Sequence, residues 1–507
     1  MWRAIFYGGN PAQVAESAEL FHDRDLTAYA DVMVNGHRQT FPIRGRGFKL
    51  WLLYGFYIGT EGGAPNREAV NSALDSIEAT ARFKGPVRDV FVRVGEHNGK
   101  LYLDLANDDY QAVEIDKEGH RVIDNPPVRF RRAPGMEALS IPEPGGSIDN
   151  LRRLINVKNE EDFVLVVSWL LAALRNVGPY AVLALLGEHG TAKSTLARLL
   201  RGLVDPNRAT LRTLPRDERD LFIAASNGYV LSFDNVSGLR DWLSDALCRL
   251  ATGGGFATRT LYTDLEETMI DAMRPIILNG ITDIVGRPDL ADRAIFLHLE
   301  PIAEDQRRTE SEVWKEFDNV RPGILGALLD AIVHGLRKLP STKLDRLPRM
   351  ADFALWATAC EGALWAAGTF AKAYDRNRGE ATSDVIEGDI IALRIRDLQK
   401  AKWEGTAAQL LALLETEEDR NSKDWPRIPR ALRSRLTRAA PMLRQIGFSG
   451  DWITRAGEDG RCPTQCTNGK SIFLKRGRYG TSGDCARYAS MPAGFDDADR
   501  DYRRGKA

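Results

Sequence analysis

The segment YAVLALLGEHGTAKSTLARLL, residues 180–200, decides the fold. Its apolar start predicts a buried strand over Tyr180–Leu186, and the spacing that follows predicts a helix over Lys193–Leu203. The glycines between them permit a tight turn. A nucleoside triphosphate needs such a turn, because backbone N–H groups must surround its β-phosphate. It also needs a lysine that reaches the β- and γ-oxygens and a hydroxyl group that binds Mg²⁺.

Each of these parts is present in the turn. Lys193 supplies the cation, and Ser194 at the helix start supplies the hydroxyl group. Ala192 stands where the pattern usually has a second glycine, and its methyl group fits if the local φ is negative. A chance glycine-rich turn capped by serine is the alternative interpretation. The predicted ATP-binding residues are Gly187, Gly190, Thr191, Ala192, Lys193, Ser194 and Thr195.

An acid for the Mg²⁺ ion is expected at the end of another strand. Asp234 follows the apolar run Tyr229–Phe233 and has this position, although a plain turn residue is the alternative. Asn235 stands where hydrolysing ATPases commonly carry a second acid that orients water. Three explanations stay open. Asp234 has both roles, a nearby acid such as Glu266 or Glu267 helps, or hydrolysis is slow.

Two further polar residues flank predicted strands. Asn279 ends the short apolar run Pro275–Leu278, where its amide group can bind the attacking water or the γ-phosphate. Arg293 stands just before the next predicted strand and can reach the γ-phosphate bound by a neighbouring subunit. The alternative for Arg293 is a salt bridge with Asp289 or Asp292.

Composition excludes several classes of protein. The 507 residues and the 43% hydrophobic content fit two to four folded domains. A net charge of −1 excludes a uniformly basic DNA-coating protein, so any nucleic-acid surface is local. Five scattered cysteines do not suit a disulfide framework, and no segment resembles a signal peptide or a membrane span. We therefore expect a cytoplasmic protein with no membrane partner.

The segment ATGGGFATRTLYT, residues 251–263, lies between Asp234 and Asn279. With the motifs on either side, it resembles the superfamily 3 helicases, in particular the primase-helicase ATPases of phages, plasmids and integrative elements. In that family the corresponding segment includes a DNA-contacting hairpin. The resemblance covers about Ser147–Leu299 in detail. Gly255 replaces an acid that is common in the family.

The resemblance implies a hexameric ring with ATP and Mg²⁺ at the subunit interfaces. Lys193 and Ser194 would then bind phosphate and Mg²⁺, and Asp234 would hold the metal. Asn279 would be the sensor of the γ-phosphate. Arg293 would be an arginine finger in trans, and Arg259 would lie near the DNA-facing loop.

The chain carries a basic stretch near its end. Arg427–Arg444 holds six arginines and no acid, and its apolar residues recur at helical spacing. The surrounding sequence resembles the winged-helix domain that often ends mobile-element primase-helicases. The predicted DNA contacts in this helix are Arg430, Arg433, Arg435 and Arg438. A solvated charged face on a packing helix is the alternative. Cys462, Cys466 and Cys485 lack a fourth ligand for zinc, so we expect free thiols.

The expected fold class is a multidomain α/β protein with a P-loop NTPase core of the AAA+/superfamily 3 helicase type. A Pro/Gly-rich linker candidate, Ile141–Ser147, separates this core from the front of the chain. The predicted regions are a β-rich or α+β N-terminal domain (1–146), the ATPase core (147–305), a helical extension (306–400), a winged-helix-like DNA-binding domain (401–476) and a flexible tail (477–507).

Three functional hypotheses remain. The leading one is an ATP-hydrolysing motor on single-stranded or forked DNA, a helicase-like replication protein of a mobile element or prophage. Acids of the front region, such as Asp104 and Asp108, lack the Asp-x-Asp spacing of a primase, so a separate primase or other replication protein is a candidate partner. The second is a nucleotide-controlled regulator or anti-phage defence switch with little or no unwinding. The third is a scaffold that binds no nucleotide.

Overall fold

In a computed structural model, the chain forms two compact units, Met1–Val385 and Ile386–Ala507. The five regions expected from composition remain predictions. None of the helices among the described residues is both long enough and apolar enough to span a membrane. The structure describes residues 17–259, 267–270, 272–281, 288–398, 402–417, 419, 425–449 and 471–476.

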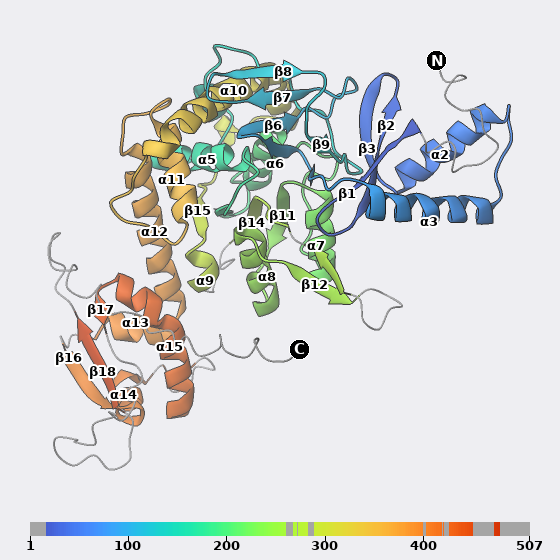
Figure 1. Ribbon diagram of the computed structural model, residues 1–507. Coiled ribbons are helices and arrows are strands. Elements are labelled where there is room, and N and C mark those ends of the chain that lie inside the picture. Colours follow the sequence, from blue (N-terminus) through green and yellow to red (C-terminus); the bar gives the residue numbers. More distant parts are fainter. Residues whose placement is uncertain are drawn as a thin grey trace, which may run out of the picture. The chain divides into compact units, whose positions relative to one another are not determined.

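A four-stranded parallel sheet lies at the centre of the first unit (Figure 1). Its strand order is β11-β14-β10-β15, which differs from the order along the chain. Parallel neighbours need crossover connections, so helices must lie between the strands in sequence. The apolar runs between polar, helix-forming stretches predict alternating helices and strands in a parallel sheet, and the structure confirms this order. The strands are β10 (Val182–Leu186), β11 (Leu231–Val236), β14 (Ile276–Gly280) and β15 (Ala294–His298).

Helices cover both faces of this sheet. In β10, Leu183 and Leu185 belong to one hydrophobic core, whereas Val182 and Ala184 belong to another. The first core includes α5, α6, α10 and α11, and the second includes α7 and α8. A strand buried on both faces explains the uninterrupted apolar run in the sequence. The helices are α5 (Glu160–Ala173), α6 (Lys193–Val204), α7 (Glu218–Asn227), α8 (Asp241–Thr252), α10 (Glu310–Lys338) and α11 (Ala351–Glu361).

A side chain covers the edge of the sheet at β15. Asn377 lies on α12 (Thr369–Gly388) and is 2% exposed. The backbone N–H of Phe296 donates to Oδ1 of Asn377 (3.1 Å), and Nδ2 of Asn377 donates to the carbonyl oxygen of Phe296 (2.5 Å). The amide group of Asn377 thus satisfies the backbone groups that a further strand would otherwise pair with.

The front of the first unit contains a three-stranded antiparallel sheet, β1-β2-β3, and a four-stranded one, β5-β6-β7-β8. The helical spacing of Val70, Leu74, Ile77 and Ala81 predicts one helix in this region, over about Arg67–Arg82. That helix is confirmed as α3 (Arg67–Lys84), with the Asn66 side chain as its N-cap, but the prediction of one helix is wrong, because α2 (Arg46–Gly59) precedes it. The other elements are β1 (Glu19–His22), β2 (Ala28–Val34), β3 (His37–Pro42), β4 (Val90–Phe91), β5 (Val94–His97), β6 (Lys100–Asp104), β7 (Ala112–Ile115), β8 (His120–Ile123) and β9 (Arg129–Phe130).

A buried ion pair joins this front region to the central sheet. Arg93 is fully buried, and its Nε donates to Oδ1 of Asp205 (3.0 Å), while its other N–H groups bind backbone carbonyl oxygens. Oδ2 of Asp205 accepts the backbone N–H groups of Tyr229 and Val230, both at 3.1 Å. Asp205 is the C-cap residue of α6, so one carboxylate connects the front region, α6 and the chain that enters β11.

The predicted linker lies against α10. Its Glu143 N–H donates to the carbonyl oxygen of Pro322 (3.0 Å). A β-carbon at Gly146 would lie 2.0 Å from the carbonyl oxygen of Gly323, and one at Gly326 would lie 1.9 Å from that of Glu143. The glycines therefore permit close packing of two backbones. The remaining elements of this unit are α4 (Asp149–Arg152), β12 (Phe256–Arg259), β13 (Glu267–Ile270), α9 (Pro288–Ala291), η3 (Glu304–Gln306) and η4 (Leu339–Ser341).

The second unit combines three helices with a three-stranded antiparallel sheet of order β16-β18-β17. Thr406 begins α14 with a capping box that involves Gln409. The predicted tail 477–507 and the cysteines 462, 466 and 485 lie outside the described residues. The elements are α13 (Ile390–Arg396), β16 (Lys402–Thr406), α14 (Ala407–Leu414), α15 (Pro429–Gln445), β17 (Phe448–Ser449) and β18 (Ser471–Arg476).

Candidate functional site

The glycine-rich turn connects β10 to α6, as the sequence predicts. Gly187 and Gly190 have φ values of +148° and +80°. A β-carbon at Gly187 would lie only 2.5 Å from the carbonyl oxygen of Leu299. Both the backbone conformation and the close approach therefore require glycine at this position.

Ala192 is the residue where the structure departs from expectation. Its φ is +60° and its ψ is 27°, so the expected negative φ is wrong. Ala192 is the N-cap residue of α6, where the chain turns from the loop into the helix. The turn imposes a left-handed conformation even on a residue with a β-carbon, at a cost of about 1 kcal/mol. The position keeps the backbone shape that glycine would adopt.

Lys193 folds back over the loop. Its Nζ donates to the carbonyl oxygens of Gly187 (2.7 Å) and Glu188 (2.6 Å) and approaches Oγ1 of Thr191 at 3.2 Å. Burial lowers the pKa of Lys193, and the charge of Asp234 opposes this shift. The cation is thus held by neutral oxygens and forms no ion pair with any carboxylate that the structure describes. An anion that enters the loop meets an unneutralised charge.

The other three predicted residues meet at one point. The Ser194 hydroxyl group lies 3.1 and 3.3 Å from the two carboxylate oxygens of Asp234. Nδ2 of Asn279 donates to Oγ of Ser194 (3.0 Å) and to Oδ1 of Asp234. Asn279 is 1% exposed. A hydroxyl group and a carboxylate form an oxygen donor set of the kind that Mg²⁺ prefers.

The sheet explains why these residues meet. Asp234 and Asn279 lie toward the carboxyl ends of β11 and β14, and Ser194 begins the helix after β10. In parallel strands these ends share one edge, where ligands of α/β proteins bind. The pairing of β11 with β14 shifts between Phe233 and Val236, so β11 continues past its predicted end and carries Asp234 in an irregular segment.

Asn235 is exposed and has a φ of +53°. Its backbone N–H donates to Oδ1 of Asp234 (3.0 Å). The residue after Asp234 therefore helps to orient the carboxylate through its backbone. Glu266 lies outside the described residues, and Glu267 begins β13.

Arg293 lies at the other edge of the sheet. β10 and β15 are parallel, with Val182 opposite Ala294, so Arg293 precedes the first residue of β15. The glycine-rich loop begins after the last residue of β10. At 3.3 Å per residue, the start of the loop lies about 16 Å along the strand direction from the beginning of β10, where Arg293 lies. Nη1 of Arg293 donates to the backbone oxygen and the carboxylate of Asp289. The salt bridge between Arg293 and Asp289, which was the alternative to the finger role, is therefore present. Arg293 does not reach the glycine-rich loop of its own chain.

Two segments that sequence reasoning missed lie against the loop. The N–H of Ile302, in the segment after β15, donates to the carbonyl oxygen of Gly190 (3.4 Å). Nδ2 of Asn156, which precedes α5, donates to the carbonyl oxygens of Thr191 (3.2 Å) and Glu300 (2.6 Å). Neither residue belongs to a local motif, so only the three-dimensional fold identifies them.

The predicted DNA-binding residues lie in two places. Arg259 ends β12, which pairs with β13 in a two-stranded antiparallel sheet. The residues between these strands, 260–266, lie outside the described residues. In the second unit, α15 buries the predicted apolar face, and Arg430 and Arg438 are exposed. Arg433 and Arg435 are partly exposed and interact with other parts of the protein.

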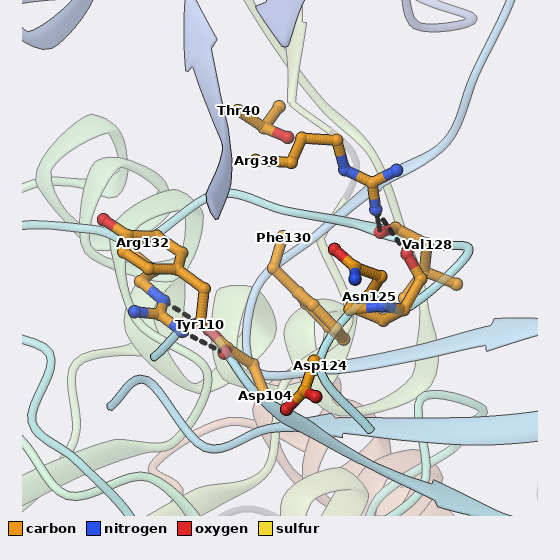
Figure 2. A pocket seen from close by; sticks show the side chains of 10 residues that line it. Arg38, Thr40, Asp104, Tyr110, Asp124, Asn125, Val128, Phe130 and Arg132 are labelled. Atoms are coloured by element: carbon orange, nitrogen blue, oxygen red, sulfur yellow. Dashed lines mark hydrogen bonds and ion pairs between the residues drawn. The ribbon is translucent and has the colours of Figure 1, made fainter. Parts of the chain in front are cut away.

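A polar pocket in the front region is closed by the protein's own bonds (Figure 2). Nη2 of Arg38 donates to backbone oxygens, including that of Val128 at 2.9 Å. Nη2 of Arg132 lies 2.8 Å from Oδ1 of Asp104, and its guanidinium group lies 3.8 Å from the ring centre of Tyr110. The enclosed space is about 20 Å³, enough for one water molecule. The hydrogen bonds and the ion pair of these arginines hold the walls of the pocket together.

Two family models match the sequence. The model of the actinomycete integrative conjugative element replication protein, RepA, matches residues 148–377, and that of the RepA C-terminal domain matches residues 390–468. Together they cover more than half of the chain. Over these residues the chain is similar to RepA replication proteins of integrative conjugative elements. The first match includes the loop and the Ser194–Asp234–Asn279 cluster, and the second includes α15.

Solved structures that match the chain include the apo form of the NrS-1 C-terminal region, with 14% identity over 92% of this chain and 99% of that chain, at a TM-score of 0.41. The SCCmec type IV Cch active helicase has 15% identity over 90% of this chain and 92% of that chain, also at a TM-score of 0.41. These scores are too low to support any conclusion about function. No curated protein matches the sequence.

Proposed function

We propose that this replication protein binds and hydrolyses ATP with Mg²⁺ and uses the energy to move along or unwind DNA. One observation carries the proposal, namely that Ser194, Asp234 and Asn279 form a hydrogen-bonded cluster beside the loop of Lys193. This is the arrangement of a P-loop NTPase core, in which a strand, a glycine-rich loop and a helix hold the phosphates. The match to a family of replication proteins supports a role on DNA.

Each residue of the cluster has a role that follows from its contacts. Lys193 exchanges its bonds to loop carbonyl oxygens for bonds to the β- and γ-phosphate oxygens. The hydroxyl group of Ser194 and the carboxylate of Asp234 hold Mg²⁺, which neutralises the charge that develops on the phosphates. The remaining loop residues, Thr191, Ala192 and Thr195, provide backbone N–H groups and helix-end N–H groups for the phosphates.

Asn279 orients water through its amide group. Its Nδ2 now binds Ser194 and Asp234, so it already points at the place where metal and phosphate would lie. A buried amide with a fixed orientation can bind the attacking water or the γ-phosphate without reorganisation. Arg293 acts in trans, because it lies at the opposite edge of the sheet from the loop of its own chain. The site is therefore complete only in an oligomer, for which a hexameric ring is the expected form.

The DNA-binding surfaces are α15 and the β12–β13 pair. The second unit has the element order α13, β16, α14, α15, β17, β18, which suits a winged helix with α15 as the recognition helix. Arg430 and Arg438 supply exposed charge there, and Arg259 lies at the end of β12. The expected substrate is single-stranded or forked DNA. A separate primase or another replication protein is the expected partner.

The test replaces Lys193 by Ala and measures ATP affinity, ATP turnover and unwinding of a forked duplex. Turnover should fall to background, because the loop loses the cation that reaches the β- and γ-phosphates from the helix start. Lys315→Ala is the control, since Lys315 is exposed on α10 and should leave turnover unchanged. Turnover of K193A at the wild-type rate would overturn the assignment of the site.

Asn235 favours a second candidate function. Without an acid after Asp234, hydrolysis is slow unless Asp234 itself accepts the proton of the attacking water. The protein would then be a nucleotide-controlled regulator or defence switch. Tight ATP binding without strand separation would support this candidate, whereas ATP-dependent separation of a forked duplex would support the motor.

A further inference from the structure

Two adjacent arginines, Arg307 and Arg308, lie in the segment between β15 and α10, and their surroundings differ. Nη2 of Arg308 lies 2.5 Å from Oε2 of Glu316 and is neutralised by it. Arg307 is exposed and forms no ion pair with any carboxylate that the structure describes. Its Nε donates to the backbone oxygen of Ile302 (3.3 Å). One of the two cations is thus satisfied, and the other is available to a ligand.

Arg307 lies beside the glycine-rich loop. A β-carbon at Gly190 would lie 4.0 Å from Nη2 of Arg307. The same segment is attached to the loop by the bond from the N–H of Ile302 to the carbonyl oxygen of Gly190 (3.4 Å). The guanidinium group and the loop are therefore connected through Ile302, which binds both.

The backbone around Arg307 is fixed from both sides. The backbone N–H of Arg307 donates to the carbonyl oxygen of Glu304 (3.4 Å), and Arg307 is the C-cap residue of η3. Two residues later, Thr309 begins α10 with a capping box that involves Glu312. A long side chain on a fixed backbone loses less freedom when it binds a ligand than one on a loose loop.

We propose that Arg307 binds a phosphate group of the nucleotide held by the loop of the same subunit. This inference rests on the proposed ATP site. Lys193 approaches the phosphates from the helix start, and Arg307 approaches from the apex of the loop. A guanidinium group suits this position, because it presents several N–H donors and stays charged at any physiological pH. Arg307 then makes nucleotide affinity depend on the segment that leads into α10.

The experiment measures the dissociation constants of ATP and ADP by calorimetry for full-length wild type, R307A, R307K and R308A. We expect R307A to weaken ATP binding about tenfold, as for the loss of one charge-assisted hydrogen bond. R308A should bind as wild type does, because Arg308 is already paired with Glu316. R307K should recover part of the affinity. An effect on ATP alone would place the contact on the γ-phosphate, and an equal effect on ADP would place it on an inner phosphate.

Wild-type ATP and ADP affinity in R307A would overturn the inference. This outcome is distinct from failure of the proposed function, in which wild type itself binds no ATP or K193A binds it normally. The thermal midpoint of nucleotide-free R307A should equal that of wild type, because the side chain is exposed. A large drop in that midpoint together with weaker binding would assign Arg307 a structural role and would also overturn the inference.

Discussion

Ala192 holds a left-handed backbone conformation at a position that usually belongs to glycine. Glycine adopts this conformation without strain, so Ala192→Gly should stabilise the first unit by about 1 kcal/mol and raise its thermal midpoint by roughly 1–2 °C. Ala197→Gly is the matched control, because Ala197 is buried in the middle of α6, where glycine is unfavourable. A thermal melt of each variant should show opposite shifts. A lower midpoint in A192G would contradict the strain at this residue.

At the scale of residues, the sequence predicts those site residues that are positioned by their own local segment of chain. Lys193 and Ser194 are positioned by their neighbours in the chain, and Asp234 and Asn279 by the end of an apolar strand. Asn156 and Arg307 come to the loop from segments far away in sequence, and neither has a pattern of its own. The sequence also could not predict the sign of φ at Ala192. A tight turn can have either sign of φ at this position, and the way the chain enters α6 decides which one it adopts.

At the scale of elements, the buried pair of Arg93 and Asp205 should dominate the stability of the first unit. Arg93→Met removes the nearer cation of Asp205 and leaves this buried carboxylate with Arg201 alone, whose Nη2 lies 3.9 Å away, so the free energy of unfolding should fall by about 3 kcal/mol. Arg24→Met breaks an exposed pair with Asp89 and should cost no more than about 1 kcal/mol. Urea titration followed by tryptophan fluorescence compares the two. Equal losses would mean that the buried pair contributes no more than a surface pair.

The arginines of α15 should be visible in the salt dependence of DNA binding. Each contact between an arginine and a phosphate adds about 0.9 to the slope of the logarithm of affinity against that of salt concentration. The double variant Arg430→Ala, Arg438→Ala should therefore reduce the slope by about 2. The double variant Lys343→Ala, Arg346→Ala removes two exposed cations from the first unit and is the control. An unchanged slope in the α15 variant would favour the solvated-face interpretation.

The ends of helices and strands could be predicted only where a turn-forming residue interrupts an apolar run of the sequence. The run Val90–Val94 reads as one strand, but Arg93 has a φ of +67° and separates β4 from β5. α2 was missed because most of its sequence is apolar, and its exposed residues include Leu50, Tyr54 and Tyr57 as well as the charged Lys49. Helical periodicity becomes hard to recognise when both faces are apolar.

At the scale of the whole molecule, the proposed role of Arg293 in trans predicts that ATP hydrolysis requires assembled subunits. K193A and R293A should each be inactive alone, and an equimolar mixture should recover about a quarter of wild-type turnover, because that share of interfaces pairs an intact loop with an intact finger. A mixture of K193A with Asp234→Ala should stay inactive, because both changes affect the same site. A coupled ATPase assay of the mixtures gives the measurement. No recovery in the first mixture would exclude Arg293 as a finger in trans.

The near-neutral net charge has a physical explanation at this scale. Many of the arginines in the first unit, such as Arg93, Arg132 and Arg376, are paired with acids. Exposed arginines on α15 belong to a different part of the chain. Because Arg427–Arg444 holds six arginines and no acid, a net charge of −1 means that the rest of the chain is net negative and offsets this local basic helix.

Asn377 limits the ways in which copies of this protein can join. By occupying the hydrogen-bonding positions of Phe296, it ends the sheet with a side chain. A neighbouring copy cannot extend that sheet at Phe296 without first displacing a buried amide group. Contacts between copies along this edge would instead use loops and side chains, which separate and re-form at far lower cost than a continuous sheet.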